Sequence, residues 1–414
     1  MNLRIKDYTT KVGSGVTPKG GAESYLSSGI PLFRSQNVHN FGFLLDDIAY
    51  ISEEIDEQMS GSRVLPGDVL LNITGASIGR CFFTSDDFER GNVNQHVCII
   101  RPNQRVVKSS FLHYLLISNK GQMYIDLSQT GANRQGLTIE EIRNFTFDIP
   151  SIDEQLRIVD YLNKKLAAID HRVDVLEKEK DTYARLKKSV INQAVTRGLN
   201  PNVALKDSGI DWIGMIPEHW EVKRFKDISE LNPQYEGDNL DCAVSFLPME
   251  GLRNDNIDLK EIKFGEGKGK YTYFGNDDLL VAKVTPCFEN GNIAIASNLK
   301  EGIGFGSSEI FVLRMKEDVS VRYFFYYVQT SNFQDEACST MCGVGGLKRI
   351  SPIFMRTRVV PTPPLSEQRA IADYLDEKCA KIDAAIENIS KQIDASKRLK
   401  KAIINEAISG KVLD

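Results

Sequence analysis

Two 47-residue segments of this chain repeat one another without a gap, and this repeat constrains the fold more than any other feature. The first runs from Pro150 to Thr196 and the second from Pro363 to Ser409, so each residue matches the one 213 positions later. Identical residues occupy 20 of the 47 aligned positions, including Glu-Gln, Asp-Tyr-Leu and Arg-Leu-Lys-Lys runs. Self-similarity at a fixed offset indicates a duplicated structural unit.

A weaker repeat extends into the flanking parts of the chain. Gly91–Pro102 resembles Gly304–Met315, and each is followed by an aromatic-rich helical stretch. The stretch from Leu199 to about Glu221 has no counterpart in the first half, and its Pro, Gly and Asn content is typical of a linker. We therefore predict four parts: a globular half over 1–150, a long helix over 151–198, a linker plus globular half over 199–362, and a long helix over 363–414.

Both repeat segments show the apolar spacing of a coiled coil rather than the wider stripe of a globular helix. Apolar residues recur at alternating intervals of three and four, and neither segment is interrupted by Pro or Gly within its helical pattern. A helix with such a narrow seam needs a partner, and its natural partner is its own copy. The predicted seam consists of Leu162, Ile169, Val173, Leu176, Leu375, Ile382, Ile386, Ile389 and Ile393.

Chain geometry decides the direction of this pair. A helix of about 44 residues is about 65 Å long, whereas a globular half of about 160 residues has a radius of gyration near 15 Å. The second half must end where the second helix begins, so that helix should run back along the first. We predict an α/β (α+β) protein with two pseudo-symmetric globular domains, separated by an antiparallel coiled coil with one domain at each end.

Composition sets the broad class. The 414 residues predict two or three domains at about 150 residues each. Seven cysteines without a CxxC pair indicate reduced thiols and no zinc site. The N-terminus lacks a signal peptide and no apolar run reaches the 18 or more residues of a membrane span, so we expect a cytoplasmic protein without a membrane partner.

Two unlike readers on a rigid spacer suit a split, asymmetric target, and double-stranded DNA fits that description. Polar loops at matching places in the halves supply candidate base and phosphate contacts. In the first half these are Ser14, Thr17, Lys19, Arg34, Gln36, Asn37, Asn72, Thr74, Ser77, Arg80, Asn133, Arg134 and Gln135. In the second half they are Lys283, Thr285, Glu289, Asn290, Ser307, Ser308, Lys348 and Arg349.

Charge limits this interpretation. The chain has 51 basic and 56 acidic residues, a formal net charge of −5, and neither globular half is basic overall. Because neutralised phosphates supply much of DNA affinity, we expect a partner subunit to complete the binding. A coiled-coil adaptor that binds only proteins is the alternative hypothesis.

Motifs for catalysis are absent from the sequence. It contains no N/D-P-P-Y/F methyltransferase motif, no phosphate loop of the G-x-x-x-x-G-K-[ST] type and no H-E-x-x-H. Glu261-Ile262-Lys263 would fit the tail of a nuclease pattern, but such triplets are common in a charged chain. The five histidines are scattered. We therefore predict a non-catalytic chain and keep an enzyme with an unfamiliar site as a third hypothesis.

Several segments carry a family resemblance. The P-x-x-x-E-Q-x-x-I-x-x-Y-L start of each long helix, GSGVTPKGG, GIPLFRSQNV, LPGDVLLNITGASIGR, SGIDWIGMIPEHWE and VTPCFENGN are similar to segments of the specificity subunit of type I restriction-modification enzymes. The resemblance covers essentially the whole chain. One departure is that the first half starts at Met1 without an IPEHWE-like lead-in.

The resemblance implies a function for each part. Each half would be a target recognition domain that reads one part of a split DNA sequence. The helices would dock two methyltransferase (M) subunits, which methylate adenine N6 with S-adenosylmethionine. Two restriction (R) subunits would add ATP- and Mg-dependent translocation and cleavage. No cofactor is expected on this chain itself.

Overall fold

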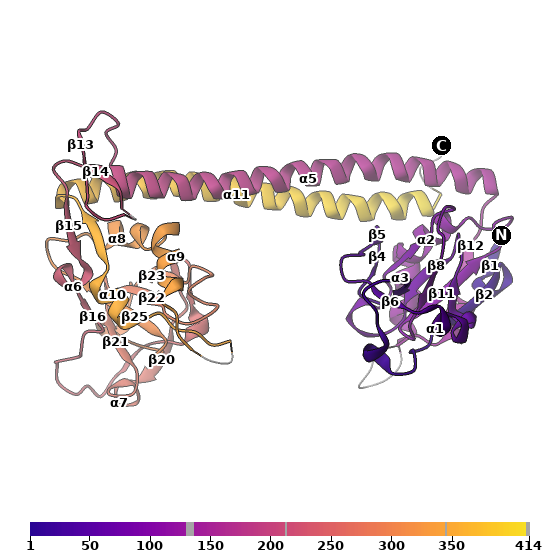
Figure 1. The fold of residues 1–414 in the computed structure, drawn as a ribbon, viewed down its shortest axis with the longest axis horizontal. Helices are drawn as coiled ribbons and strands as arrows, with labels where there is room; N and C mark the ends of the chain where they lie inside the picture. Colours follow the sequence, from indigo (N-terminus) through magenta and orange to yellow (C-terminus); the bar gives the residue numbers. More distant parts are fainter. Residues whose placement is uncertain (130–135, 212, 344–345, 411–414) are drawn as a thin grey trace. The chain divides into compact units, whose positions relative to one another are not determined.

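The computed structural model describes residues 1–129, 136–211, 213–343 and 346–410. Its residues form two compact units. Unit 1 comprises Met1–Leu176 together with the chain from Lys391 onward, and unit 2 comprises Glu177–Ser390 (Figure 1). Each unit thus contains one globular half and a part of both long helices. No helix among the described residues is long and apolar enough to cross a membrane.

Unit 1 is built on two four-stranded sheets. Its strands are β1 (Asn2–Arg4), β2 (Thr9–Ser14), β3 (Ile30–Phe33), β4 (Val38–His39), β5 (Gly42–Phe43), β6 (Ala49–Ile51), β7 (Arg63–Val64), β8 (Val69–Asn72), β9 (Cys81–Phe83), β10 (Gly91–Val93), β11 (Val97–Pro102) and β12 (Thr146–Asp148). Its shorter helices are α1 (Glu53–Gln58), α2 (Ser109–Ile117), α3 (Asn119–Leu127) and α4 (Ile139–Asn144). The sheet orders are β2-β11-β8-β9 and β6-β3-β10-β7.

Unit 2 repeats this arrangement. Its strands are β13 (Leu205–Asp207), β14 (Met215–Pro217), β15 (Glu221–Arg224), β16 (Ser229–Leu231), β17 (Ala243–Leu247), β18 (Leu252–Arg253), β19 (Asn256–Ile257), β20 (Lys260–Lys263), β21 (Thr272–Gly275), β22 (Leu279–Ala282), β23 (Ile293–Ile295), β24 (Ile303–Gly306), β25 (Ile310–Met315) and β26 (Val359–Thr362). Its shorter helices are α6 (Phe225–Ile228), α7 (Phe264–Gly267), α8 (Val321–Tyr327), α9 (Ser331–Ser339) and α10 (Pro352–Thr357). The orders β16-β25-β22-β23 and β20-β17-β24-β21 match those of unit 1, which confirms the predicted pseudo-symmetry.

The glutamine of the repeated Glu-Gln pair has the same structural role in both halves. Gln155 accepts a hydrogen bond from the backbone N–H of Lys108, and Gln368 accepts one from Ser320, at distances of 2.9 and 2.8 Å. Each glutamine also donates to the carbonyl of the proline five residues earlier. Both side chains are buried. They therefore satisfy backbone groups where each long helix joins its globular half.

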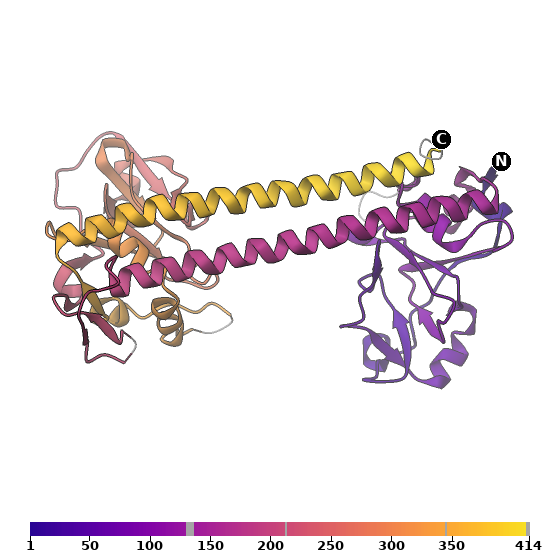
Figure 2. The same cartoon turned by 90° about the horizontal axis from the view of Figure 1, so that it is seen from above.

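The long helices are α5 (Ile152–Arg197) and α11 (Leu365–Ile408). In unit 1, Leu162 and Leu166 share a core cluster with Ile404 and Ala407. In unit 2, the C-terminal part of α5 around Val195 shares the core with the N-terminal part of α11. Residue numbers thus rise along α5 as they fall along α11, so the predicted antiparallel pairing is confirmed (Figure 2). The placement of one half at each end of the pair stays a prediction.

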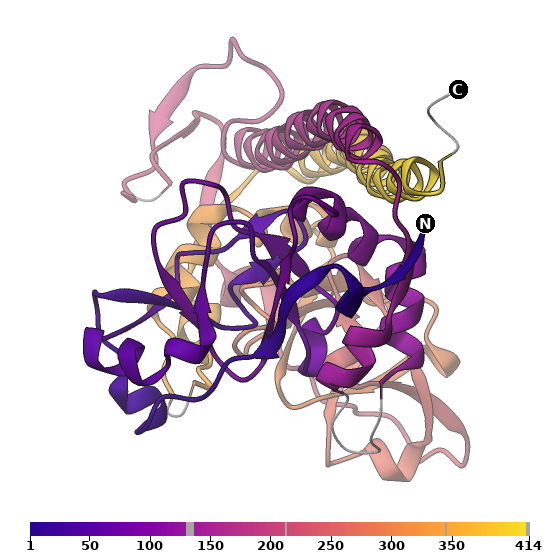
Figure 3. The ribbon, with the colours of Figure 1, turned by 90° about the vertical axis from the view of Figure 1, so that its right-hand side faces the viewer.

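Burial along the predicted seam is uneven. Ile169, Val173 and Ile386 are half-buried. The other six seam residues are buried, namely Leu162, Leu176, Leu375, Ile382, Ile389 and Ile393. In unit 1 the helix pair lies along one side of the strands (Figure 3), so part of the seam of α5 also packs on the globular core.

Two ion pairs related by the repeat link α5 to α11. In unit 1, Lys400 Nζ donates to the carboxylate oxygens of Asp170 at 2.6 and 2.8 Å. In unit 2, Lys187 Nζ donates to Asp383 at 2.8 and 2.7 Å. Lys400 also lies 3.4 Å from the centroid of the Phe41 ring, at the tip of the β4–β5 hairpin. These contacts fix the lysine against both the other helix and its own globular domain.

We predict that reversing the charge of Lys400 destabilises unit 1 and that its partner rescues it only in part. Lys400→Glu should lower the free energy of unfolding by about 1–2 kcal/mol, because the side chain is only 11% exposed and would face a carboxylate. Adding Asp170→Lys should recover the ion pair but not the Phe41 contact. Thermal unfolding of both single variants and the double variant measures the coupling. The same exchange at the exposed Lys164–Asp160 pair should change stability by less than about 0.5 kcal/mol.

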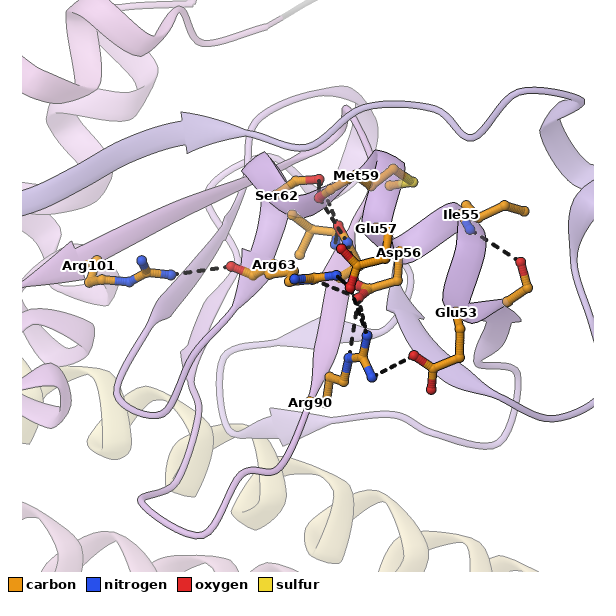
Figure 4. A network of polar contacts seen from close by, with 12 residues as sticks. Glu53, Ile55, Asp56, Glu57, Met59, Ser62, Arg63, Arg90 and Arg101 are labelled. Atoms are coloured by element: carbon orange, nitrogen blue, oxygen red, sulfur yellow. Dashed lines mark hydrogen bonds and ion pairs between the residues drawn. The ribbon is translucent and has the colours of Figure 1, made fainter.

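The second sheet of unit 1 is anchored by a buried carboxylate. Asp56 of α1 is fully buried and accepts hydrogen bonds from Arg63 at 2.6 Å, Arg90 at 2.6 Å and Asn92 at 2.9 Å (Figure 4). Ser62 donates to the Asn92 amide oxygen at 2.7 Å. This network joins α1 to β7 and β10.

Unit 2 fills the same place with aromatic rings. In unit 1 the register pairs Asn92 with Arg63, and in unit 2 it pairs Phe305 with Tyr273. The Phe305 ring packs against Phe264 of α7 at 5.7 Å and against Tyr273 at 6.1 Å. One backbone arrangement is therefore stabilised by a polar network in one half and by an apolar cluster in the other.

Candidate nucleic-acid interface

Three chain segments meet at the end of β8 in unit 1, and we call residues 73–74, 96 and 136–137 the first junction. The backbone N–H of Ile73 donates to His96 O at 3.0 Å, and Leu137 donates to Ile73 O at 2.9 Å. Thr74 forms an isolated antiparallel bridge with Gly136. The Thr74 hydroxyl lies 2.6 Å from His96 Nδ1. The junction thus presents a hydroxyl and an imidazole side by side.

The same three segments meet at the end of β22 in unit 2, and we call residues 283–285, 309 and 348–350 the second junction. Lys283 N donates to Glu309 O at 3.0 Å, and Ile350 N donates to Lys283 O at 2.9 Å. Val284 bridges Arg349, as Thr74 bridges Gly136. The guanidinium of Arg349 donates from Nε and Nη2 to the Glu309 carboxylate at 2.8 and 3.0 Å. This junction therefore presents an ion pair.

Most predicted residues of the second half gather at this junction. Thr285 Oγ1 donates to the Lys348 carbonyl at 3.0 Å. Lys283 Nζ lies 5.4 Å from the Phe311 ring centroid. Ser307 Oγ accepts from Glu309 N at 3.2 Å, which shapes the β24–β25 turn. Ser308, Lys348 and Arg349, which lie within or next to the junction segments, are exposed. Glu289 and Asn290 are exposed on the loop after β22.

In the first half, the structure brings fewer of the predicted residues to the junction. Ser14 ends β2 opposite Cys98, close to the turn that carries His96. The next residue, Gly15, has no room for a side chain, because a Cβ would lie 1.9 Å from Val93 O. Around the first junction, Thr74 and Ser77 are half-buried and Arg80 is exposed. Thr17 and Lys19 are exposed on the loop after β2.

Two predicted base-contacting asparagines have a structural role instead. Asn37 is 1% exposed and donates to Leu44 O at 2.9 Å. Asn72 is fully buried and donates to Ser35 O at 2.7 Å. Because their amides hold the protein's own loops, we correct the prediction that Asn37 and Asn72 contact bases. The Asn72 amide oxygen has no hydrogen-bond partner among the described residues.

Two further candidates near Asn37, Arg34 and Gln36, both form hydrogen bonds with Asp47. Arg34 Nη2 donates to the Asp47 carbonyl at 2.6 Å, and Gln36 donates to the Asp47 carboxylate. Gln36 is exposed and Arg34 is half-buried. Asn133, Arg134 and Gln135 lie outside the described residues.

The candidate residues chosen from the sequence include neither His96 nor Glu309. Both occupy the position directly before an apolar strand, in Gln95-His96 and Ser308-Glu309, 213 residues apart. A charged or aromatic polar residue at the start of an otherwise buried strand was the available signal.

The electrostatics of the junctions favour polar recognition over catalysis. The hydrogen bond from Arg349 holds the pKa of Glu309 below its ordinary value, so the pair stays charged at neutral pH.

A buried cysteine–histidine pair lies elsewhere in unit 1. Cys81 Sγ lies 3.6 Å from His113 Nδ1, but burial raises the pKa of the thiol and lowers that of the imidazole to about 3. Both are therefore held neutral, the opposite of an activated thiolate–imidazolium pair. Among the described residues, no group of three or more His, Cys, Asp or Glu could hold a metal.

Comparison with known proteins gives one family. The model of the type I restriction modification DNA specificity domain matches residues 3–176 and again 217–395. The specificity subunit of the type I restriction enzyme EcoAI from Escherichia coli is 33% identical over 46% of this chain. This chain spans about a third of the length of that relative and of the EcoEI subunit, 33% and 32%.

Two further matches cover more of the chain. The MjaVIII specificity subunit of Methanocaldococcus jannaschii is 23% identical over 83% of this chain and 79% of its own length. A chain in a solved structure of a type I R-M system has a TM-score of 0.73 over 100% of this chain and 98% of its own, at 15% identity. The latter shows a shared fold.

Proposed function

The chain belongs to the type I restriction modification DNA specificity family, and on this premise we propose that it reads a split, asymmetric sequence in double-stranded DNA. Each unit would read one half of the site. The observation that carries the proposal is the pair of junctions. They share the same backbone hydrogen bonds but expose unlike side chains, Thr74 and His96 in one and Glu309 and Arg349 in the other. An unchanged scaffold with changed donors and acceptors is what two readers of different bases require.

We further propose that the chain acts as an assembly subunit and performs no catalysis itself. Two methyltransferase subunits would dock on α5 and α11, and two restriction subunits would join them. S-adenosylmethionine, ATP and Mg would be bound by those partners. The net charge of −5 supports a partner that supplies phosphate contacts.

Retention on DNA tests the proposal. The chain is purified with its co-expressed methyltransferase subunit and passed over immobilised duplexes of different sequence, at fixed salt concentration. We expect retention that depends on two separated half-sites. Equal retention on every duplex, or none, contradicts DNA reading and favours the protein–protein adaptor.

A single substitution should separate the two half-sites. Arg80 is exposed beside the first junction, so Arg80→Ala should weaken discrimination in one half of the methylated motif by about tenfold and leave the other unchanged. Methylome sequencing measures both halves at once. Arg105→Ala, exposed beyond the opposite end of β11, should leave both halves unchanged. Loss in both half-sites would show that the units do not read independently.

A further inference from the structure

We propose that Arg349 reads a guanine in the half-site bound by unit 2, with Glu309 as its positioning residue. This assignment rests on the proposed function, because it requires that the second junction faces DNA. It goes beyond that function by naming the base and the side chain that selects it. The orientation of the guanidinium, the acceptors of guanine and the contrast with unit 1 support the assignment.

Glu309 occupies one edge of the guanidinium. It accepts from Nε at 2.8 Å and from Nη2 at 3.0 Å. The group is planar with five N–H donors in a fixed fork. The edge formed by Nη1 and the second hydrogen of Nη2 has no other hydrogen bond or ion pair among the described residues. The Arg349 side chain is 44% exposed and that of Glu309 is 27% exposed. The carboxylate therefore holds one edge of a partly exposed guanidinium and leaves the donors of the other edge for a ligand.

The free edge matches guanine. Guanine presents two acceptors, O6 and N7, on its major-groove edge, and two parallel N–H donors satisfy both. Adenine presents a donor in place of O6, so one donor of the fork would be opposed. A fork that is already oriented loses less conformational entropy on binding than a free side chain. We therefore expect discrimination for guanine of about tenfold to a hundredfold at one position.

Unit 1 has no arginine at the position of Arg349, so the assignment concerns one half-site only. Gly136 stands where Arg349 stands, and His96 stands where Glu309 stands, as the matching bridges and hydrogen bonds show. The two junctions therefore offer different groups from the same backbone frame. Gly136 has no side chain to contact a base, so we expect no equivalent guanine requirement in the half-site bound by unit 1.

Methylome sequencing of cells that express the full chain with its methyltransferase subunit tests the assignment. With Arg349→Ala, one G·C pair in one half-site should become unspecified, by about tenfold or more, while the other half-site is unchanged. Arg349→Lys keeps the charge but not the fork and should relax the same position. Glu309→Gln should weaken discrimination at that position only. Lys300→Ala, which removes an exposed ion pair with Glu261 in the same unit, should leave the motif unchanged.

Two results would overturn the assignment. If the Arg349–Glu309 pair only stabilised its loop, the variants would lower methylation of every site equally and leave the motif intact. An unchanged motif in both Arg349 variants would thus remove Arg349 as a reader while the proposed function stands. A wild-type complex that methylates no split motif would instead overturn the proposed function, and the assignment with it.

Discussion

Replacing Ile386 and Ile389 by aspartate should destabilise the helix pair by roughly 3 kcal/mol or more and abolish binding of the methyltransferase subunit. Ile389 is 5% exposed and Ile386 is half-buried in α11. Two carboxylates at these positions would lose their water without gaining a partner, in a seam only one side chain wide. Urea unfolding followed by far-UV circular dichroism measures the stability, and co-purification measures the assembly.

A matched control separates burial from charge. Ala384 and Asn388 lie on the same helix, within the same turns, and are exposed. Ala384→Asp with Asn388→Asp adds the same two negative charges and should change stability by less than about 1 kcal/mol. If this variant and the seam variant behaved alike, or if assembly survived in the seam variant, the seam would not hold the helices together.

The internal repeat made the helices and the pseudo-symmetry predictable. A seam of alternating three- and four-residue spacing needs a partner helix, and the duplication supplies one. The antiparallel direction of the pair then followed from chain geometry. The same repeat located Gln155 and Gln368 without revealing their role. Their hydrogen bonds join residues 47 and 48 positions apart, to Lys108 and Ser320, which no local pattern shows.

The candidate interface was less predictable, because a polar loop residue can either contact a ligand or hold a neighbouring loop of the protein. Asn37 and Asn72 have the chemistry of base readers, yet both are buried and hold loops. The sequence repeat aligns His96 with Glu309, but only the backbone hydrogen bonds show that both lie at a junction. Sequence composition could identify the kind of residue in a loop but not whether its side chain faces outward.

The sequence also did not show that a polar network in one half is replaced by aromatic residues in the other. Asn92 and Phe305 occupy equivalent positions, as do Arg63 and Tyr273. A polar residue in one half and an aromatic one in the other reduce the sequence similarity while the strand pairing persists. This exchange is one reason why the repeat is weaker in the globular halves than in the helices.

The polar network of unit 1 should make the loss of Asp56 costly to the stability of that unit. Asp56→Ala should lower the free energy of unfolding by about 3 kcal/mol, because it leaves Arg63, Arg90 and the buried Asn92 amide without their shared acceptor. The arginine side chains are 29% and 39% exposed and can partly regain water, which holds the value toward the low end for a broken buried ion pair. Thermal or urea unfolding measures the loss.

The pH dependence of unfolding tests whether the charged Asp56 carboxylate causes this loss of stability. Burial alone would raise the pKa of Asp56, but hydrogen bonds from Asn92, Arg90 and Arg63 together outweigh it, so its pKa lies below the ordinary value. A lowered pKa in the folded state stabilises the protein fully above the unfolded value of about 3.9, and this contribution is lost as the pH falls through the folded value. The stability gap between wild type and Asp56→Ala should therefore be constant at neutral pH and shrink only below about pH 4.

Glu54→Ala on the same helix provides the comparison, because Glu54 is exposed. It should change stability by about 0.5 kcal/mol or less. Asp56→Asn keeps the shape and one acceptor oxygen but removes the charge, and should fall between the two. A gap of the same size for Glu54→Ala, or one that persists unchanged to pH 2, would show that the network around Asp56 does not hold the second sheet of unit 1 together.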